Sequence, residues 1–359
     1  MTPPAVQVHS QDPCLSPKKM GTKISKEDHQ NRTKSHLQPR FSLPPTTPPS
    51  SRTDIVIGGI RVYVYGLEEL VHKADVEVAV LYLAHNRKRS YLVTEDIAYE
   101  VLHSYRTERG RRKRYELIAV TINMRNHGDR EVSPHANYTW DDGNDNHGMD
   151  LLSMISGSAQ DFKLILDYLP AYLPQFTRFH NIMAGVSLGA HTAWRMASLA
   201  APGQIEGFAM VVGCPSLSPL LLSRLGIEQA TGAGATAAAA TRYEGLAELM
   251  TDEQRRRWPR ALAELVLEGD RFVADEFPTD VPVLLCNGAV DPLVPPQYTA
   301  AWVHRRRKVT ERENGAQHEE GGQQVRLFVQ ENTGHSCTKE MVSLIASWLG
   351  DLFQVYEYE

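Results

Sequence analysis

The chain has 359 residues, of which 42% are hydrophobic, and this is enough apolar sequence for one large core. Its formal net charge of −5, with no basic stripe, argues against a nucleic-acid-binding protein. No apolar run is long enough for a signal peptide or a membrane span, so we expect a cytoplasmic protein.

The N-terminal segment differs in composition from the rest of the chain. Residues 1–52 are rich in Pro, Ser, Thr and Lys and have no periodic apolar pattern. Such a segment cannot bury enough apolar surface to offset the conformational entropy that ordering would cost. We therefore expect a disordered tail over residues 1–52 and one folded domain over residues 53–359.

Apolar runs and amphipathic runs alternate through the folded part. Residues 55–66 predict a β-hairpin that turns at Gly58 and Gly59. Further buried strands are predicted at residues 76–83, 117–122, 182–186, 208–213, 281–288 and 325–330. Helices are predicted at residues 97–105, at residues 151–169 (ending before Pro170) and from residue 339 onward. This alternation predicts an α/β fold, a doubly wound and mostly parallel sheet of eight strands with an antiparallel start.

The most informative motif is Gly185-Val186-Ser187-Leu188-Gly189. An apolar run precedes it and an amphipathic run follows it, so the order is strand, sharp turn and helix. A serine on such a turn projects from the edge of the sheet, and the glycines let strand and helix approach closely. The start of the helix then offers free N–H groups where an oxyanion would form.

An acid and a histidine follow this serine at matching positions. Asp291 comes after the apolar run at residues 281–288, and His335 comes after the run at residues 325–330. In a parallel sheet the carboxyl ends of the strands share one edge, where ligands bind. We therefore expect Ser187, Asp291 and His335 to lie at the same edge.

Rival positions fit less well. The loop after the strand at residues 208–213 carries no carboxylate, and Asp275 and Asp280 precede their strand and so face the opposite edge. His318 lies in a polar stretch at residues 310–324, which we interpret as a solvated loop.

With these motifs in this order, the chain resembles the α/β-hydrolases over roughly residues 54–355. It is most similar to the branch that includes dienelactone hydrolases and prolyl-oligopeptidase-like esterases. The resemblance implies that Ser187 is the nucleophile, that His335 is the general base and that Asp291 orients the histidine. It also implies an oxyanion hole built from the backbone N–H of Leu188 and a second N–H, which we assign to Asn86.

Three other residues are candidates for contact with substrate. His85 precedes Asn86, where many relatives have His-Gly. His127 lies in a stretch that resembles a wall of the substrate site in some relatives, although a turn held by Asp129 and Arg130 is the favoured interpretation. Trp140 could line an acyl pocket or pack at the surface.

No metal or organic cofactor is expected. The acidic stretch at residues 140–147 resembles a calcium loop, but its glycine is in the wrong register and no glutamate closes it. The cysteines have no metal-ligand spacing, and two of them, Cys214 and Cys286, are expected to be reduced core residues.

An insertion at residues 215–280 precedes the strand that bears the acid. It is longer than one helix needs and contains an alanine-rich stretch, so it could form either a lid over the pocket or a surface loop.

The function expected from these features is serine hydrolysis of a carboxylic ester or thioester of small size. The alternatives are an acyltransferase or a small-peptide hydrolase that uses the same triad, or a non-catalytic binding protein with a hydrolase fold. The substrate and the oligomeric state stay open.

Overall fold

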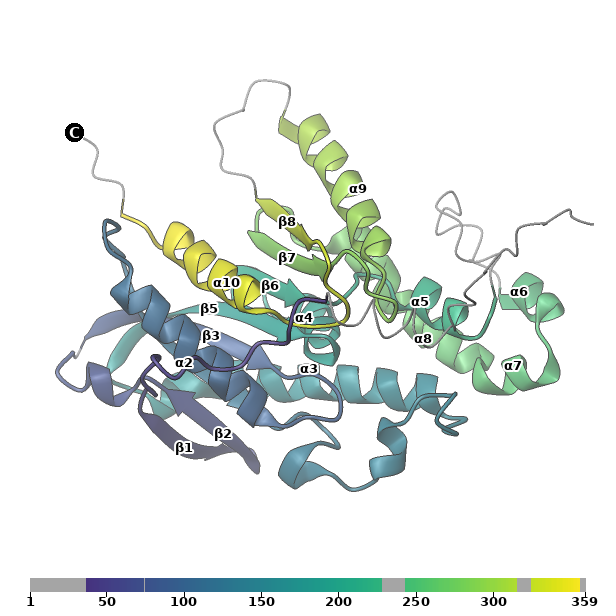
Figure 1. Cartoon of the computed structure of the whole chain (residues 1–359), viewed down its shortest axis with the longest axis horizontal. Helices are drawn as coiled ribbons and strands as arrows, with labels where there is room; N and C mark the ends of the chain where they lie inside the picture. Colours follow the sequence, from purple (N-terminus) through teal and green to yellow (C-terminus); the bar gives the residue numbers. More distant parts are fainter. Residues whose placement is uncertain (1–36, 74, 228–242, 315–323, 356–359) are drawn as a thin grey trace, which may run out of the picture. The chain divides into compact units, whose positions relative to one another are not determined.

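The computed structural model describes residues 37–73, 75–227, 243–314 and 324–355. One sheet has the strand order β1-β2-β4-β3-β5-β6-β7-β8 (Figure 1). Strand β2 is antiparallel to both of its neighbours, and all other neighbouring strands are parallel. The predicted eight-stranded, mostly parallel sheet with an antiparallel start is confirmed.

The strands are β1 (Arg52–Ile57), β2 (Ile60–Tyr65), β3 (Val76–Ala84), β4 (Glu116–Ile122), β5 (Phe176–Val186), β6 (Gly207–Val211), β7 (Val283–Gly288) and β8 (Val325–Gln330). The α-helices are α2 (Tyr91–Thr107), α3 (His147–Tyr172), α4 (Leu188–Leu199), α5 (Leu217–Arg224), α6 (Tyr243–Leu249), α7 (Asp252–Arg257), α8 (Arg260–Arg271), α9 (Pro296–Asn314) and α10 (Lys339–Leu352). Short helical turns are η1 (Glu68–Leu70), η2 (Gly128–Arg130), η3 (Pro134–Asn137) and η5 (Phe272–Glu276).

The hairpin turns where the sequence predicted it. Gly58 and Gly59 join β1 to β2 with φ values of +56° and +81°. A two-residue turn with both residues at positive φ matches the twist of the flanking strands, and glycine adopts it without steric cost.

Helices cover both faces of the sheet. Helices α2 and α10 pack side by side on one face, and α3 and α4 pack together on the other (Figure 1). The alternation along β3 shows the two cores, since Val80 faces the α3 side and Leu81 faces the α2 side. Because both faces are buried, the central strands are apolar at successive positions, which is why they stood out in the sequence.

Helix α3 does not stop at Pro170 as expected but continues to Tyr172. A proline in the last turn removes only one backbone hydrogen bond, and the N–H of Leu173 still donates to the carbonyl of Leu169 at 3.1 Å. The helix can therefore pass through this proline near its end.

Residues 38–51, which we expected to belong to a disordered tail, are part of the folded domain. The N–H of Gln38 donates to the carbonyl of Asn332, and the N–H of Phe41 donates to that of Cys337, at 2.7 and 2.8 Å. Thr47 is buried, and its hydroxyl donates to the Glu100 carboxylate at 2.5 Å. These contacts come from distant loops and helices, so local composition gave no sign of them. Residues 1–36 lie outside the described part.

The insertion at residues 215–280 is largely helical where it is described. It contributes α5, and after a gap α6, α7, α8 and η5; the alanine-rich stretch falls in the gap at residues 228–242. The half-buried Asp270 of α8 accepts the N–H groups of Leu217 and Ser218 at 2.8 Å each, so it holds the start of α5.

Three further expectations can be compared with the fold. Helix α9 runs to Asn314, so the first part of the expected loop at residues 310–324 is helical, and residues 315–323 lie outside the described ranges. Cys214 and Cys286 are buried free thiols, as expected. Within the described ranges, no helix combines the length and the hydropathy that crossing a bilayer requires.

The packing of residues 38–51 predicts a position-specific effect on stability. Thr47→Val should lower the free energy of unfolding by about 1–2 kcal/mol, because the buried Glu100 carboxylate loses a hydrogen-bond donor. Thr46→Val, at the exposed neighbouring position, should change it by less than about 0.5 kcal/mol. Urea unfolding of both variants measures the difference, and equal effects would contradict the described packing.

Candidate active site

Ser187 lies on a strained turn between β5 and α4. Its φ and ψ are +55° and −111°, which a non-glycine residue rarely adopts. The turn is held on both sides, because the Ser187 N–H donates to the carbonyl of Val211 and its carbonyl accepts the N–H of His191, at 2.9 and 3.0 Å. The hydroxyl is therefore presented at the carboxyl edge of the sheet, as the motif predicted.

The two glycines of the motif are required by close backbone contact. A Cβ on Gly189 would lie 1.9 Å from the carbonyl oxygen of Ala84, at the end of β3. A Cβ on Gly185 would lie 2.2 Å from the carbonyl group of Gly189. No flexible side chain can move aside here, so the turn tolerates no substituent at either position.

Ser187, His335 and Asp291 form one hydrogen-bonded chain. The Ser187 Oγ lies 2.7 Å from His335 Nε2, and His335 Nδ1 lies 2.8 Å from Asp291 Oδ2. Since an ionised carboxylate only accepts, Nδ1 carries the proton and Nε2 is left to accept the hydroxyl proton of Ser187. An arrangement of this kind can activate a serine hydroxyl as a nucleophile.

Asp291 is fixed by more than the histidine. Its side chain is fully buried, and Oδ1 accepts the backbone N–H groups of Leu293 and Val294 at 2.8 and 3.0 Å. The loops that bear the acid and the histidine are also joined, because the N–H of Val290 donates to the carbonyl of Thr333 at 3.0 Å. Backbone hydrogen bonds thus fix the Asp291 carboxylate and also join the loop of Asp291 to the loop of His335.

The two residues expected to supply oxyanion donors are adjacent to Ser187 in the chain or in space. Leu188 is the first residue of α4, where a backbone N–H has no partner within the helix. Asn86 follows β3 and, together with Ser187 and His335, lines a hollow of about 20 Å³, which is about the size that one water needs. Asn86 thus shares a hollow with the hydroxyl, and Leu188 directly follows Ser187 in the chain.

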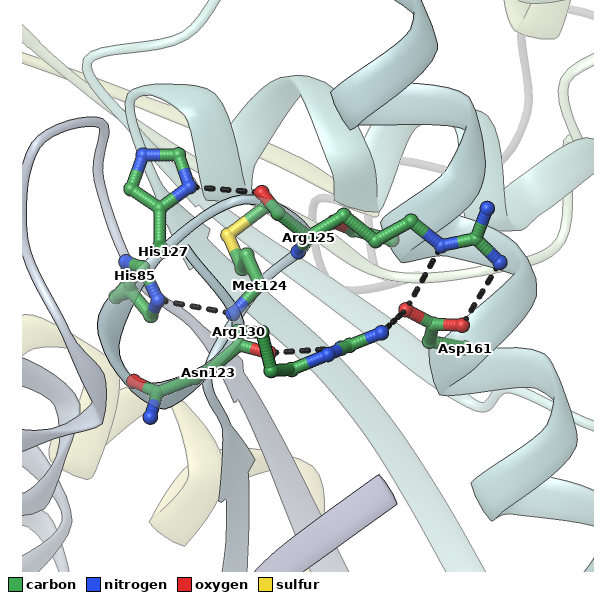
Figure 2. A network of polar contacts seen from close by, with 8 residues as sticks. His85, Asn123, Met124, Arg125, His127, Arg130 and Asp161 are labelled. Atoms are coloured by element: carbon green, nitrogen blue, oxygen red, sulfur yellow. Dashed lines mark hydrogen bonds and ion pairs between the residues drawn. The ribbon is translucent and has the colours of Figure 1, made fainter. Parts of the chain in front are cut away.

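His85 lies beneath this loop and is fully buried. Its Nε2 accepts the N–H of Met124 at 3.0 Å (Figure 2). Nδ1 therefore carries the proton and donates to the carbonyl of Asn86 at 2.8 Å. With both ring nitrogens bonded to backbone, His85 holds the loop of Asn86 against the loop after β4. His85 is not among the residues that line the two hollows beside Ser187.

His127 is also buried, and its ring lies edge-on to that of His85 at 5.3 Å. Its Nδ1 donates to the carbonyl of Arg125 at 2.8 Å. The favoured interpretation of this stretch as a structural turn agrees with the contacts. Arg130 donates to the carbonyl of Asn123 at 2.8 Å, and Asp129 accepts from the amide of Asn123 at 2.6 Å.

One buried carboxylate ties this turn to α3. Asp161 accepts two hydrogen bonds from Arg125, at 3.1 and 3.0 Å, and one from Arg130 at 2.7 Å (Figure 2). Two guanidinium groups thus share one carboxylate, so their charges are partly compensated within the protein.

A cavity of about 280 Å³ opens beside Ser187 and His335. Trp140 is 5% exposed and lines it, held by a bond from its Nε1 to the carbonyl of Asp145 at 3.2 Å. A larger, mostly apolar cavity of about 520 Å³ lies among α3, α4 and α8 but includes none of the three residues of the hydrogen-bonded chain. The chemistry therefore points to the smaller cavity.

The basic side chains and imidazoles that line the smaller cavity besides His335 were given no role from the sequence: Arg87, His147, His191 and Arg224. His191 lies one turn into α4 after Ser187, and Arg87 directly follows Asn86, so their proximity to known candidates was a usable signal. His147 and Arg224 carry no such signal, because they reach the cavity from α3 and from the insertion.

The described residues contain no group of three or more His, Cys, Asp or Glu side chains placed to hold a metal ion.

The close contact at the turn predicts a large effect of one methyl group. Gly189→Ala should lower the free energy of unfolding by about 3 kcal/mol or more, because its Cβ meets the backbone of Ala84. Gly245→Ala, on α6 where a Cβ meets nothing, should be neutral or stabilising by up to about 1 kcal/mol. Thermal and urea unfolding compare the two, and a Gly189→Ala protein as stable as the wild type would refute the described contact.

Three buried histidines predict a loss of stability in mild acid. Burial is the largest cause that lowers the pKa of His85, His147 and His191, to about 3 in each case. They stay neutral in the folded protein, whereas the unfolded chain takes up protons below pH 6.5, so the stability they contribute is present above this pH and falls as the pH drops. Between pH 7.5 and 5.5 the free energy of unfolding should fall by about 4 kcal/mol in total.

Urea unfolding at several pH values measures this loss. His85→Gln should remove about one third of the pH dependence, whereas the exposed His72→Gln should leave it unchanged. A free energy of unfolding that stays constant over this range would show that the histidines are not buried as neutral groups.

Comparison with known proteins agrees with the fold. Residues 90–340 match the alpha/beta hydrolase family. No curated protein matches the chain significantly in sequence. Among solved structures, TT1662 from Thermus thermophilus is similar with a TM-score of 0.55 and 14% identity, over 86% of this chain and 99% of that one.

Two further structures are similar at lower scores. The acylaminoacyl peptidase of Pyrococcus horikoshii has a TM-score of 0.48 and 11% identity, over 87% of this chain and 43% of that one. The esterase Pf2001 of Pyrococcus furiosus has a TM-score of 0.46 and 15% identity, over 88% of this chain and 97% of that one. The strand order and the family match over most of the chain lead to one conclusion: the chain belongs to the alpha/beta hydrolase family.

Proposed function

We propose that this protein is a serine hydrolase that cleaves a carboxylic ester or thioester through an acyl-enzyme on Ser187. The observation that carries the proposal is the hydrogen-bonded chain from Ser187 through His335 to Asp291, with distances of 2.7 and 2.8 Å. It lies at the carboxyl edge of the sheet and beside a cavity that can admit a small substrate.

In the first half of the reaction, His335 Nε2 takes the proton from Ser187 Oγ while the oxygen attacks the carbonyl carbon of the substrate. Asp291 holds the proton on Nδ1 and stabilises the imidazolium that forms. Because Asp291 accepts from two backbone N–H groups as well, its carboxylate keeps its orientation during the transfer.

The tetrahedral oxyanion is stabilised by the backbone N–H groups of Leu188 and Asn86. Each donor of this kind contributes on the order of 3 kcal/mol to transition-state stabilisation. His85 acts as a positioning residue here, because its bond to the carbonyl of Asn86 holds the residue whose own N–H is the second donor.

The tetrahedral intermediate then collapses: His335 protonates the leaving alcohol or thiol as its bond to the carbonyl carbon breaks, and the acyl group stays on Ser187. In the second half, His335 takes a proton from a water that attacks the acyl carbonyl carbon, and it returns that proton to Ser187 Oγ as the acid is released. The reaction needs no metal or organic cofactor. The 280 Å³ cavity is below the usual range of drug-sized pockets, which favours a short acyl group over a long-chain lipid.

A covalent probe and one variant test the proposal. A fluorophosphonate should label the wild-type protein once, on Ser187, and p-nitrophenyl esters of short acyl chains should be hydrolysed. Ser187→Ala should abolish labelling and lower turnover by at least about a thousandfold while its circular dichroism spectrum is unchanged.

Ser198→Ala serves as the matched control, because Ser198 lies on the same helix and donates to the carbonyl of Arg195, away from the chain of hydrogen bonds. It should keep both labelling and turnover. Turnover that is retained in Ser187→Ala would contradict the proposal. Labelling without hydrolysis, together with acyl transfer to an added alcohol, would instead identify an acyltransferase.

A further inference from the structure

Two arginines line the cavity beside Ser187. Arg87 lies in the loop between β3 and α2, and Arg224 is the last residue of α5 in the insertion. Both are only partly exposed. Neither contacts the hydrogen-bonded chain of Ser187, so the proposed hydrolysis gives them no role.

Each arginine has a neutral hydrogen-bond partner. Arg87 Nη1 lies 3.2 Å from Nδ1 of His147, and Arg224 Nη2 donates to the carbonyl of Leu293 at 2.9 Å. Among the ion pairs of the described residues, none includes Arg87 or Arg224. These contacts fix the two side chains without compensating their charges.

The carboxylates near the cavity are engaged elsewhere or solvated. Asp291 accepts from His335 and from two backbone N–H groups, and Asp142 pairs with Lys88 at 3.4 Å. Asp141 lines the cavity but is exposed to solvent.

The two positive charges also act on each other. Burial, and after it the charge of Arg224, lower the pKa of Arg87 to about 10. Burial lowers the pKa of Arg224 as well. Two partly desolvated like charges in one cavity raise the free energy of the empty protein, and a bound anion would relieve this cost.

The pair Arg125 and Arg130 provides a contrast within the same molecule. There the two guanidinium groups share the buried carboxylate of Asp161 (Figure 2). Beside Ser187, no carboxylate of the described residues forms an ion pair with Arg87 or Arg224, and Asp142 and Asp291 act on them only from a distance.

The histidines that line the cavity add no charge to the two arginines. Burial first, and then the two arginines, lower the pKa of His147 to about 3, and burial with Arg224 does the same for His191. Both are neutral near pH 7, so Arg87 and Arg224 dominate the charge around the cavity.

We infer that Arg87 and Arg224 bind an anionic oxygen group of the substrate, a carboxylate or a phosphate, so that the substrate is a small ester or thioester with a negative charge in addition to its scissile bond. This inference rests on the proposed hydrolase function. A guanidinium binds such groups with two parallel N–H···O bonds, and two guanidinium groups from different elements fix both the position and the orientation of the anion.

The test compares two substrates that differ in charge. 4-Nitrophenyl hydrogen adipate carries a terminal carboxylate, and its methyl ester is the neutral counterpart; release of 4-nitrophenolate reports the same scissile bond in both. The wild-type protein should have a kcat/KM at least about tenfold higher for the anionic ester, since hydrogen bonds between charged groups are worth that much or more.

Variants show whether the arginines cause the preference. Arg87→Gln and Arg224→Gln should each lower the ratio of kcat/KM values, anionic over neutral, by about tenfold to a hundredfold. Arg224→Lys should restore part of the ratio because it keeps the charge but not the planar fork. Arg89→Gln, an exposed position in the same loop as Arg87, removes an equal charge and should leave the ratio as it is.

Competition and equilibrium binding identify the anion. Adipate and butyl phosphate should both inhibit hydrolysis of the neutral ester competitively, and butan-1-ol should not; the stronger of the two inhibitors tells a carboxylate site from a phosphate site. Calorimetric titration of both anions into Ser187→Ala, alone and combined with Arg224→Gln, measures binding without turnover.

The outcomes separate this inference from the proposed function. Hydrolysis that depends on Ser187 but shows equal kcat/KM for both esters, with no effect of the arginine variants, overturns the inference alone. Absence of hydrolysis together with arginine-dependent anion binding overturns the hydrolase proposal and leaves the anion site standing. Absence of both hydrolysis and anion binding overturns the hydrolase proposal and the anion site together.

Discussion

The close contact between backbones at the turn of Ser187 is the constraint on which the rest of the site depends. Gly189 lies against the carbonyl of Ala84, and Gly185 lies against Gly189, so β3, β5 and the start of α4 meet without side chains between them. This approach forces Ser187 into its strained conformation and presents its hydroxyl at the edge of the sheet. The same contact brings the loop that follows Ala84, with Asn86, to the side of that hydroxyl.

The remaining polar geometry is built on backbone hydrogen bonds rather than on side-chain packing alone. The loops after β7 and β8 are joined to each other, and Asp291 is held by two N–H groups of its own loop. His85 performs a similar task on the other side, where it joins the loops after β3 and β4. Each proposed functional group is therefore oriented by neighbours that take no part in the chemistry, which is the condition for a preorganised site.

Charge is distributed unevenly over this edge of the molecule. Arg125 and Arg130 share a buried carboxylate and stabilise the turn that follows β4. Arg87 and Arg224 have neutral partners and line the cavity of Ser187. Arg125 and Arg130 are compensated, as a structural cluster requires. Arg87 and Arg224 leave positive potential where a substrate would lie, and this difference is the basis for the binding role proposed for them.

The sequence by itself determined the elements and their order. The sheet, the glycine turn and the placement of Ser187, Asp291 and His335 after β5, β7 and β8 followed from local patterns of apolar residues and turn residues. The reason is that both faces of a parallel sheet are buried and the carboxyl ends of its strands share one edge. Only the tertiary structure decided which distant residues join them. Residues 38–51 are held on the domain, and Arg87 and Arg224 line the same cavity, through contacts between segments that lie far apart in the chain. No local pattern of residues encodes such contacts.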